Sequence, residues 1–279
     1  MTTGEALEAA ARAARERSSE ATLWDARILL AHALGHANPL ALEPRSPLPD
    51  RARIRFEELW SRRLEGVPVQ HLVGEWDFFG RPFSVDGRGL IPRPETEVLI
   101  LQAIGAAPGT RRILDLGTGS GIIAVTLLRE LPEARAVAID ASVDALALAR
   151  KNALRHGVLP RIQLLASDWL TALDGPPFDL VVSNPPYLAR SEAGRLSRTV
   201  AQHDPALALY GGDDGLECIR GLLDAVPAVL LPGAPFVFEI GFGQAREIEK
   251  EVRSREAWQF EGISVDLSGI PRVTRLRRT

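Results

Sequence analysis

From about residue 111 to the end of the chain, short apolar runs alternate with stretches in which apolar residues recur every three or four positions. Runs rich in Val, Ile and Leu are typical of buried strands, and the longer period is typical of amphipathic helices. Strands are expected at 113–116, 136–140, 162–165, 178–182, 235–240, 258–265 and 273–277. Helices are expected at 122–129, 143–155, 216–231 and 244–253. This alternation predicts an α/β domain with a parallel sheet between two layers of helices.

The first part of the chain has helical periodicity and no strand pattern. Helices are expected at 3–17, 22–34 and 50–64, and they predict a small helical bundle. The third helix is expected to turn Ile54, Phe56, Leu59 and Trp60 inward.

The third helix is also rich in charge. Its arginines are accompanied by glutamates that can pair with them, which predicts a solvated face, with a partner-docking face as the alternative. The residues concerned are Arg51, Arg53, Arg55, Arg62 and Arg63 with Glu57, Glu58 and Glu65.

Between these two parts the pattern is that of a hairpin. Residues 75–85 have aromatic strand character, interrupted by Gly80, Arg81 and Pro82. Glycines and prolines then shape a linker up to Pro94, after which a helix is expected at 95–104. We therefore expect an N-terminal helical domain at 1–73 that recognises the substrate, a β-hairpin linker at 74–94 and a second domain at 95–279.

Composition and charge narrow the class of protein. The chain has 279 residues, 46% of them hydrophobic, which is ordinary for a globular protein with a large core. Its net charge of -3 lacks the basic excess of a protein with a large nucleic-acid footprint. The histidines show no metal-ligand spacing, so no metal is expected. Cys218 stands alone and is expected to be a small buried hydrophobe. With no leader-like start and no apolar run of membrane-spanning length, the protein is expected to be cytoplasmic and away from membranes.

A glycine-rich loop joins the first expected strand of the second domain to the next helix. It reads Gly117-Thr118-Gly119-Ser120-Gly121, with Asp115 two residues before it. Glycines let a ligand approach the backbone, and the helix N-terminus that follows points toward that ligand. This loop is therefore a candidate cofactor site, and a tight strand-to-helix turn with no ligand is the alternative.

Acidic residues follow the next two strands. Asp140 lies about twenty residues beyond the glycine loop, where a carboxylate can accept hydrogen bonds from both hydroxyls of a ribose. A helix cap is its alternative role. Asp168 and Trp169 end the third strand and suit an adenine, by hydrogen bond and ring contact. The alternative there is a buried Trp169 with Asp168 as a cap.

The fourth strand ends in Asn184-Pro185-Pro186-Tyr187. Two prolines fix the backbone in an extended form at the carboxyl end of a strand, where ligands bind in open α/β sheets. The Asn184 side-chain oxygen and the Pro185 carbonyl can both accept hydrogen bonds from one planar NH2 group, on which Tyr187 can stack. An ordinary strand-ending turn is the alternative.

Together these motifs resemble a class I S-adenosylmethionine-dependent methyltransferase. The narrower resemblance, over nearly the whole chain, is to the HemK/PrmC protein-glutamine N5-methyltransferases of peptide-chain release factors. It rests on Asn184-Pro185-Pro186-Tyr187 and on Ile91-Pro92-Arg93-Pro94-Glu95-Thr96-Glu97. Segments 68–80, 206–216 and 266–273 are also similar to that family. One departure is His203-Asp204-Pro205, where the family usually has Glu before the proline, so no catalytic role is assigned to Asp204.

The resemblance implies a Rossmann-like methyltransferase domain with a small N-terminal helical bundle. It implies S-adenosylmethionine as cofactor, S-adenosylhomocysteine as product, and the glutamine of the Gly-Gly-Gln loop of bacterial class 1 release factors as substrate. Catalysis would fall to Asn184, Pro185 and Tyr187, with Pro186 also in contact with the substrate. The cofactor would lie on the glycine loop, Asp140, Asp168 and Trp169, and would also contact Asn184.

Two rival functions stay open at this point. Methyltransferases that act on exocyclic amino groups of nucleic acid bases also present an Asn-Pro-Pro-aromatic loop, on which a flipped base can stack. The near-neutral charge and the segment from Ile91 to Glu97 favour a protein substrate, so no direct nucleic acid binding is expected. The other rival is a catalytically silent scaffold that binds release factors, which the intact glycine loop, Asp140 and Asn184 disfavour.

Overall fold

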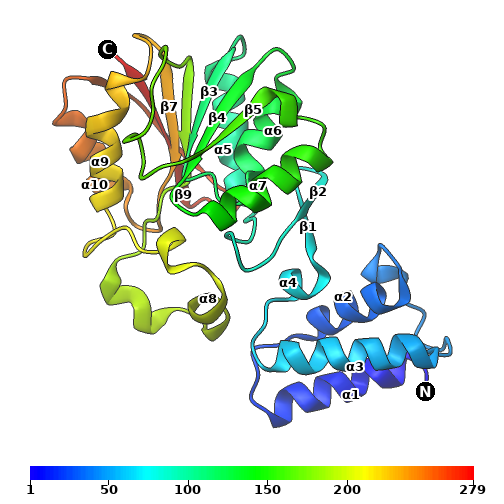
Figure 1. Ribbon diagram of the computed structural model, residues 1–279. Helices are drawn as coiled ribbons and strands as arrows, with labels where there is room; N and C mark the ends of the chain where they lie inside the picture. Colours follow the sequence, from blue (N-terminus) through cyan, green and yellow to red (C-terminus); the bar gives the residue numbers. More distant parts are fainter. The chain divides into compact units, whose positions relative to one another are not determined.

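The structure is a computed structural model that describes residues 1–279, apart from the side chains of Arg195 and Arg198. The chain forms two compact units, shown in Figure 1. The first comprises Met1–Glu75 and Ser197–His203, and the second comprises Trp76–Leu196 and Asp204–Thr279. The roles expected of residues 1–73, 74–94 and 95–279 stay predictions.

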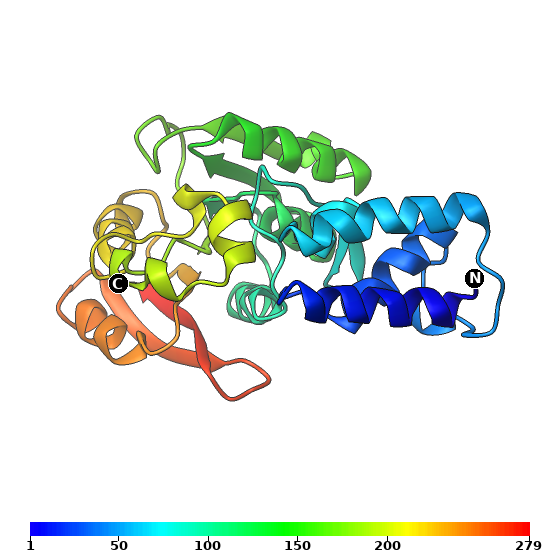
Figure 2. The ribbon, with the colours of Figure 1, turned by 90° about the horizontal axis from the view of Figure 1, so that it is seen from below.

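The first unit is helical. Its helices α1, α2 and α3 pack together, as Figure 2 shows, and each lies within a few residues of its predicted range. Thr2 and Thr22 form capping boxes at the starts of α1 and α2, and Gly35 ends α2 with a φ of 74°. The short helices α4 and α8 were not predicted, because five or six residues are too few to show a helical period. The bounds are α1 Thr3–Glu16, α2 Leu23–Leu34, α3 Asp50–Leu64, α4 Val69–Val73 and α8 Arg198–His203.

Helix α3 differs from the prediction at two positions. Its buried stripe comprises Ala52, Phe56, Leu59, Trp60 and Arg63, positions that share one helix face. Ile54 lies off that stripe and is 50% exposed, so the prediction that it faces inward is wrong.

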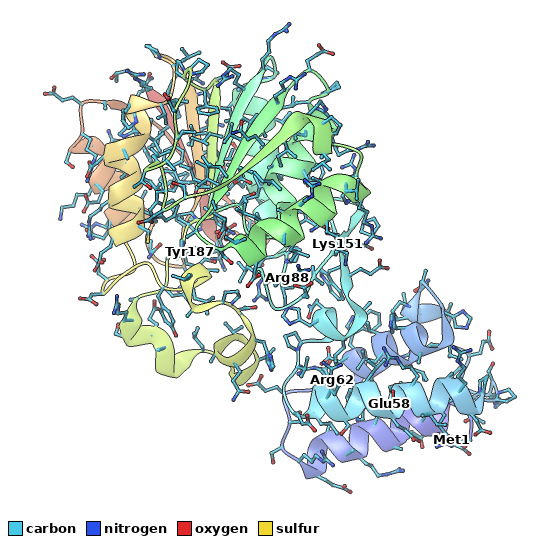
Figure 3. The ribbon with its side chains drawn as sticks, viewed as in Figure 1. Met1, Glu58, Arg62, Arg88, Lys151 and Tyr187 are labelled. Carbon is cyan, nitrogen blue, oxygen red and sulfur yellow. The ribbon has the colours of Figure 1, made fainter. Side chains whose placement is uncertain are left out.

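Arg63 likewise does not belong to the solvated face. It is buried, and its Nε lies 3.0 Å from Oδ2 of Asp25 on α2. The remaining charges of α3 are exposed or half-buried, with ion pairs such as Arg53 to Glu57 at 2.9 Å. Figure 3 shows Glu58 and Arg62 on this helix.

The second unit is built on a seven-stranded sheet in the order β5-β4-β3-β6-β7-β9-β8. Strands β3 to β7 are parallel, which confirms the predicted sheet, whereas β9 runs antiparallel to both β7 and β8. The turn between β8 and β9 is too short for the crossover that a parallel pair needs. The bounds are β3 Arg112–Leu116, β4 Arg135–Asp140, β5 Ile162–Ala166, β6 Leu180–Ser183, β7 Pro235–Glu239, β8 Trp258–Val265 and β9 Pro271–Arg278.

Helices cover both faces of this sheet (Figure 1). Two clusters of buried hydrophobic residues form the cores of this unit. Helices α5 (Thr96–Ala106), α6 (Ile122–Glu130) and α7 (Val143–Arg155) cover one face, and α9 (Glu217–Ala225) and α10 (Ala245–Arg253) cover the other. Helix α9 ends earlier than predicted, because Pro227 cannot continue an α-helix and a 3-10 turn replaces its last part. Among the described residues, no helix is long and apolar enough to cross a membrane. The 3-10 turns are Pro39–Ala41, Leu159–Arg161, Arg190–Arg195, Ala206–Ala208 and Val226–Ala228.

The predicted hairpin is present as β1 (Glu75–Phe78) and β2 (Arg81–Ser84). Phe83 is fully buried in the core of the second unit. The buried side chain of Asn152 on α7 accepts from the N–H of Ser84 over 2.8 Å and donates to the carbonyls of Ser84 and Ser120. One side chain therefore ties the hairpin to the glycine loop.

Candidate active site

Strand β3 ends between two neighbours, and its end defines the site. Leu116, its last residue, pairs with Ile139 of β4 on one side and with Ser183 of β6 on the other. The chain continues from β3 outward through β4 and β5, and then crosses to β6 on the other side. A ligand crevice forms where connections diverge in this way, outside the carboxyl ends of the strands. The glycine loop, Asp140 and Asn184 therefore meet at one edge.

A cavity of about 670 Å³ lies at this edge. Its volume is within the range of sites that hold a cofactor or drug-sized ligand. Among the residues predicted from sequence, those that line it are Gly117, Thr118, Gly119, Ser120, Asp140, Asp168, Trp169, Asn184 and Pro186. Gly121, Pro185 and Tyr187 are outside the lining, so the structure brings together most but not all of the predicted site. Figure 3 labels Tyr187 and the lining residue Arg88 at this edge of the sheet.

The glycine loop is shaped by positive φ angles. Gly117 and Gly119 have φ values of 71° and 55°, which glycine adopts at no steric cost. A Cβ added at Gly119 would meet nothing within 4 Å, so the backbone there faces open space. Gly121 has a different reason to be glycine, since a Cβ there would lie 2.9 Å from that of Ala149 on α7. Its cofactor-binding role stays a prediction.

Asp115 supports the loop from below. It is fully buried, accepts from the Thr118 hydroxyl over 2.6 Å, and accepts from the N–H of Ala124 over 3.2 Å. Burial raises the pKa of Asp115 to about 7, with the hydrogen bond from Thr118 opposing the rise. The acid before the first glycine therefore holds the turn together.

Asp140 and Trp169 flank the loop. Oδ2 of Asp140 accepts from the N–H of Gly119, and Oδ1 accepts from the N–H of Ser142, both over 2.8 Å. The cap of α7 is Ser142, not Asp140. Trp169 is only half-buried, has a φ of 49°, and lies within contact distance of where a Cβ on Gly117 would be. The alternative of a buried Trp169 is therefore wrong, and its indole borders the cavity instead. Asp168 is exposed at the cavity wall.

The loop formed by residues 184–187, here called the Asn184 loop, is held in place by the segment that precedes α9. Leu188 and Leu209 are joined by a backbone hydrogen bond of 2.9 Å, as are Gly211 and Leu188. The side chain of Gln244, at the start of α10, donates to the Tyr187 carbonyl over 2.8 Å. These bonds hold the backbone around the two prolines from behind and leave Asn184 and Pro186 facing the cavity.

Sequence reasoning missed two side chains behind Asn184. The hydroxyl of Thr96 donates to Oε2 of Glu239 over 2.7 Å, and Nδ2 of Asn184 donates to Oγ1 of Thr96 over 3.4 Å. The Tyr187 hydroxyl donates to Oε1 of Glu239 over 3.3 Å. Burial raises the pKa of Glu239 to about 7 and also raises the pKa of Tyr187. The signals available were the segment from Ile91 to Glu97, which holds Thr96, and an acid that ends an apolar strand.

Asp204, where the chain departs from the family pattern, forms an ion pair from a buried position. Its carboxylate is almost fully buried and lies 3.1 Å from a guanidinium nitrogen of Arg93. A buried carboxylate needs such a partner, and Arg93 itself lines the cavity. Asp204 therefore anchors the cavity wall through Arg93.

Comparisons with known proteins add independent findings. Residues 5–74 match the family model of the PrmC N-terminal domain, and residues 95–209 match that of the methyltransferase small domain. The release factor glutamine methyltransferase of Bradyrhizobium diazoefficiens is 40% identical, over 99% of this chain and 96% of its own. That of Cereibacter sphaeroides is 42% identical, over 99% of both chains.

Two solved structures share the fold. A ribosomal protein L11 methylase from Lactobacillus delbrueckii subsp. bulgaricus has a TM-score of 0.51 at 21% identity, covering 68% of this chain and 81% of its own. A methyltransferase from Pyrococcus furiosus has a TM-score of 0.55 at 17% identity, covering 72% of this chain and 90% of its own. At these identities the likeness concerns the fold alone, and it confirms the predicted class of α/β domain.

Proposed function

Because the chain belongs to the release factor glutamine methyltransferase family, we propose that it methylates the side-chain amide nitrogen of the glutamine in the Gly-Gly-Gln loop of bacterial class 1 release factors. The chain covers nearly the full length of relatives with that name at about 40% identity. The feature of this chain that carries the proposal is Asn184 at the wall of a cavity beside the glycine loop. In the proposed enzyme, Asn184 would therefore hold the substrate amide next to the bound cofactor.

The cavity suits S-adenosylmethionine. The open space over Gly119 allows close approach of a ligand to the backbone, and Asp140 lies at the adjacent strand end. Each Asp140 oxygen accepts one backbone N–H and has a further lone pair for a ribose hydroxyl. The half-buried indole of Trp169 offers an apolar face to an adenine. When bound, this cofactor supplies a methyl group that is already activated by a sulfonium.

The acceptor needs orientation more than deprotonation. An amide nitrogen is a poor nucleophile because its lone pair is delocalised into the carbonyl group. Hydrogen bonds from its two N–H groups to Oδ1 of Asn184 and to the Pro185 carbonyl would aim the lone pair at the methyl group. The same two acceptors would stabilise positive charge that grows on nitrogen. Tyr187 would pack against the amide plane. These residue roles are part of the proposal.

Mass spectrometry of the product tests this function. The full chain is incubated with S-adenosylmethionine and a purified class 1 release factor, and the Gly-Gly-Gln peptide is then isolated. We expect a gain of one methyl group on the glutamine. Radiolabelled methyl groups offered to release factor and to nucleic acid in parallel separate the two rival functions. Label in nucleic acid alone would favour a base methyltransferase, and label in neither would favour a silent scaffold.

We further propose that the helical first unit recognises the body of the release factor. It contains none of the residues that line the cavity. A glutamine loop by itself offers little surface for a selective encounter, and a second contact raises its effective concentration at the site.

A further inference from the structure

Glu239 lies beside Asn184 because of the register between their strands. Ser183, the last residue of β6, pairs in parallel with Phe238 of β7. The residues that follow them, Asn184 just beyond β6 and Glu239 at the end of β7, therefore lie at the same level along the two strands. Glu239 is only 2% exposed. A carboxylate at this depth must be matched by hydrogen-bond donors, and the identity of those donors decides what it does.

Two hydroxyl groups satisfy this carboxylate. Thr96 donates to Oε2 over 2.7 Å, and Tyr187 donates to Oε1 over 3.3 Å. A threonine hydroxyl carries one proton and can donate only once. When Glu239 is ionised it can only accept, so the Thr96 proton is directed to it and the Thr96 oxygen can offer Asn184 only a lone pair. The polarity of the next contact is thereby fixed.

Asn184 responds to that polarity. Its Nδ2 group donates to Oγ1 of Thr96 over 3.4 Å. In a planar amide the oxygen points away from the nitrogen, so this contact leaves Oδ1 for a ligand in the cavity that Asn184 lines. We propose that Thr96 and Glu239 are positioning residues for methyl transfer, which keep the Asn184 oxygen turned toward the acceptor amide.

This inference rests on the proposed function and extends it to residues behind the site. Glu239 acts through its neighbours, since both of its oxygens accept hydroxyl groups. The same carboxylate restrains Tyr187, so one buried acid orients both polar side chains of the Asn184 loop. Without the Thr96 oxygen, the Asn184 side chain can rotate and turn its NH2 group toward the cavity. The substrate glutamine amide also presents N–H groups there, so the two sets of donors would repel each other.

Substitutions at Thr96 test the link. Thr96→Val keeps the shape and removes the hydroxyl, whereas Thr96→Ser keeps the hydroxyl and removes a methyl group. We expect Thr96→Val to lower kcat about 5- to 30-fold, as expected for the loss of an orienting hydrogen bond. The dissociation constant of S-adenosylmethionine should stay within about twofold, and Thr96→Ser should restore most of kcat. Thr126→Val is the matched control, because Thr126 is fully buried in α6 and its hydroxyl has no partner among the described residues.

The readouts separate positioning from support of the fold. A structural role would lower kcat and cofactor binding together, in proportion to the fraction unfolded, and it would be visible in the melting curve. Glu239→Gln, which is equal in size, is the second variant if Thr96→Val does not fold. Its amide has one oxygen for two hydroxyl donors, so kcat should again fall at unchanged cofactor affinity.

Wild-type kcat in Thr96→Val would overturn the inference, as would a Thr96→Ser variant as slow as Thr96→Val. A full-length wild type that binds S-adenosylmethionine but leaves the release-factor glutamine unmethylated would contradict the proposed function itself, and the inference with it.

Discussion

The backbone N–H of Gly119 donates a hydrogen bond of 2.8 Å to Oδ2 of Asp140. The tip of the glycine loop and the end of β4 therefore hold each other in place at the wall of the cavity. One carboxylate thus has two tasks in the proposed enzyme, because it shapes the loop and also has lone pairs left for a ribose. An experiment on Asp140 therefore has to distinguish its role in the loop from its role in ribose binding.

Asp140→Ala should weaken S-adenosylmethionine binding by roughly 10- to 150-fold, as expected for the loss of a charge-assisted hydrogen bond. Calorimetry measures the dissociation constant, and Asp144→Ala, an exposed acid in the first turn of α7, controls for the change in charge. An analogue of S-adenosylhomocysteine without ribose hydroxyls identifies the task. If Asp140 holds the ribose, the analogue should bind the wild type more weakly than S-adenosylhomocysteine does. The Asp140→Ala variant should bind the analogue and S-adenosylhomocysteine about equally well. An equal penalty in both proteins would assign Asp140 to the loop alone.

Asn184→Ala should lower turnover by roughly 10²–10³-fold, by analogy with the loss of one oxyanion-hole donor. The proline-flanked backbone keeps its braces from Leu209 and Gln244, so the fold and the cofactor affinity should persist. Turnover is measured on the glutamine peptide, with calorimetry on the same preparation as the control for folding. Near-normal turnover in a variant that binds cofactor would refute the acceptor role.

The stability of the protein should carry a signature of Glu239. Burial raises its pKa from the ordinary value of 4.5 to about 7, so the folded state resists its ionisation while the unfolded state does not. The stability that Glu239 contributes is full below about pH 4.5 and is lost as the pH rises through about 7. The loss amounts to roughly 3 kcal/mol by this difference in pKa. Urea unfolding of the wild type and Glu239→Gln at pH 5 and pH 8 measures it.

The Glu239→Gln variant should gain stability relative to the wild type between these two pH values. Asp115, whose pKa burial also raises to about 7, is present in both proteins and therefore cancels from the comparison. A difference in stability that does not change with pH would show that Glu239 titrates normally.

A chain that starts near Gly74 should retain the cavity, since its lining residues all belong to the second unit. It should bind S-adenosylmethionine and methylate a short Gly-Gly-Gln peptide about as well as the full chain, yet act poorly on intact release factor. The truncation removes Glu20, whose carboxylate accepts from the Thr199 hydroxyl over 3.0 Å, so circular dichroism must first show a folded product. Full-length rates on intact release factor would remove the docking role from the first unit.

The sequence by itself determined the elements and the chemistry that local pattern encodes. The apolar runs predicted the five parallel strands, and the spacing of glycines predicted a loop after β3 that faces open space at Gly119. Asn184 could be placed at a strand end from the apolar run that precedes it and the two prolines that follow it. These features follow from residues close in the chain, where steric limits on the backbone and side-chain period act directly.

Only the tertiary structure decided which of these elements lie side by side. Thr96 and Glu239 are 143 positions apart, and they meet because β7 lies next to β6 and α5 packs against β7. The exposure of Ile54 likewise depended on which face of α3 meets its neighbours. Segment Ser197–His203 belongs to the first unit although it follows the Asn184 loop in sequence. Local pattern carries no information on such pairings, because they arise from the order of strands and the packing of faces. The orientation of the Asn184 side-chain amide, with Nδ2 directed at Thr96, was therefore visible only in the folded chain.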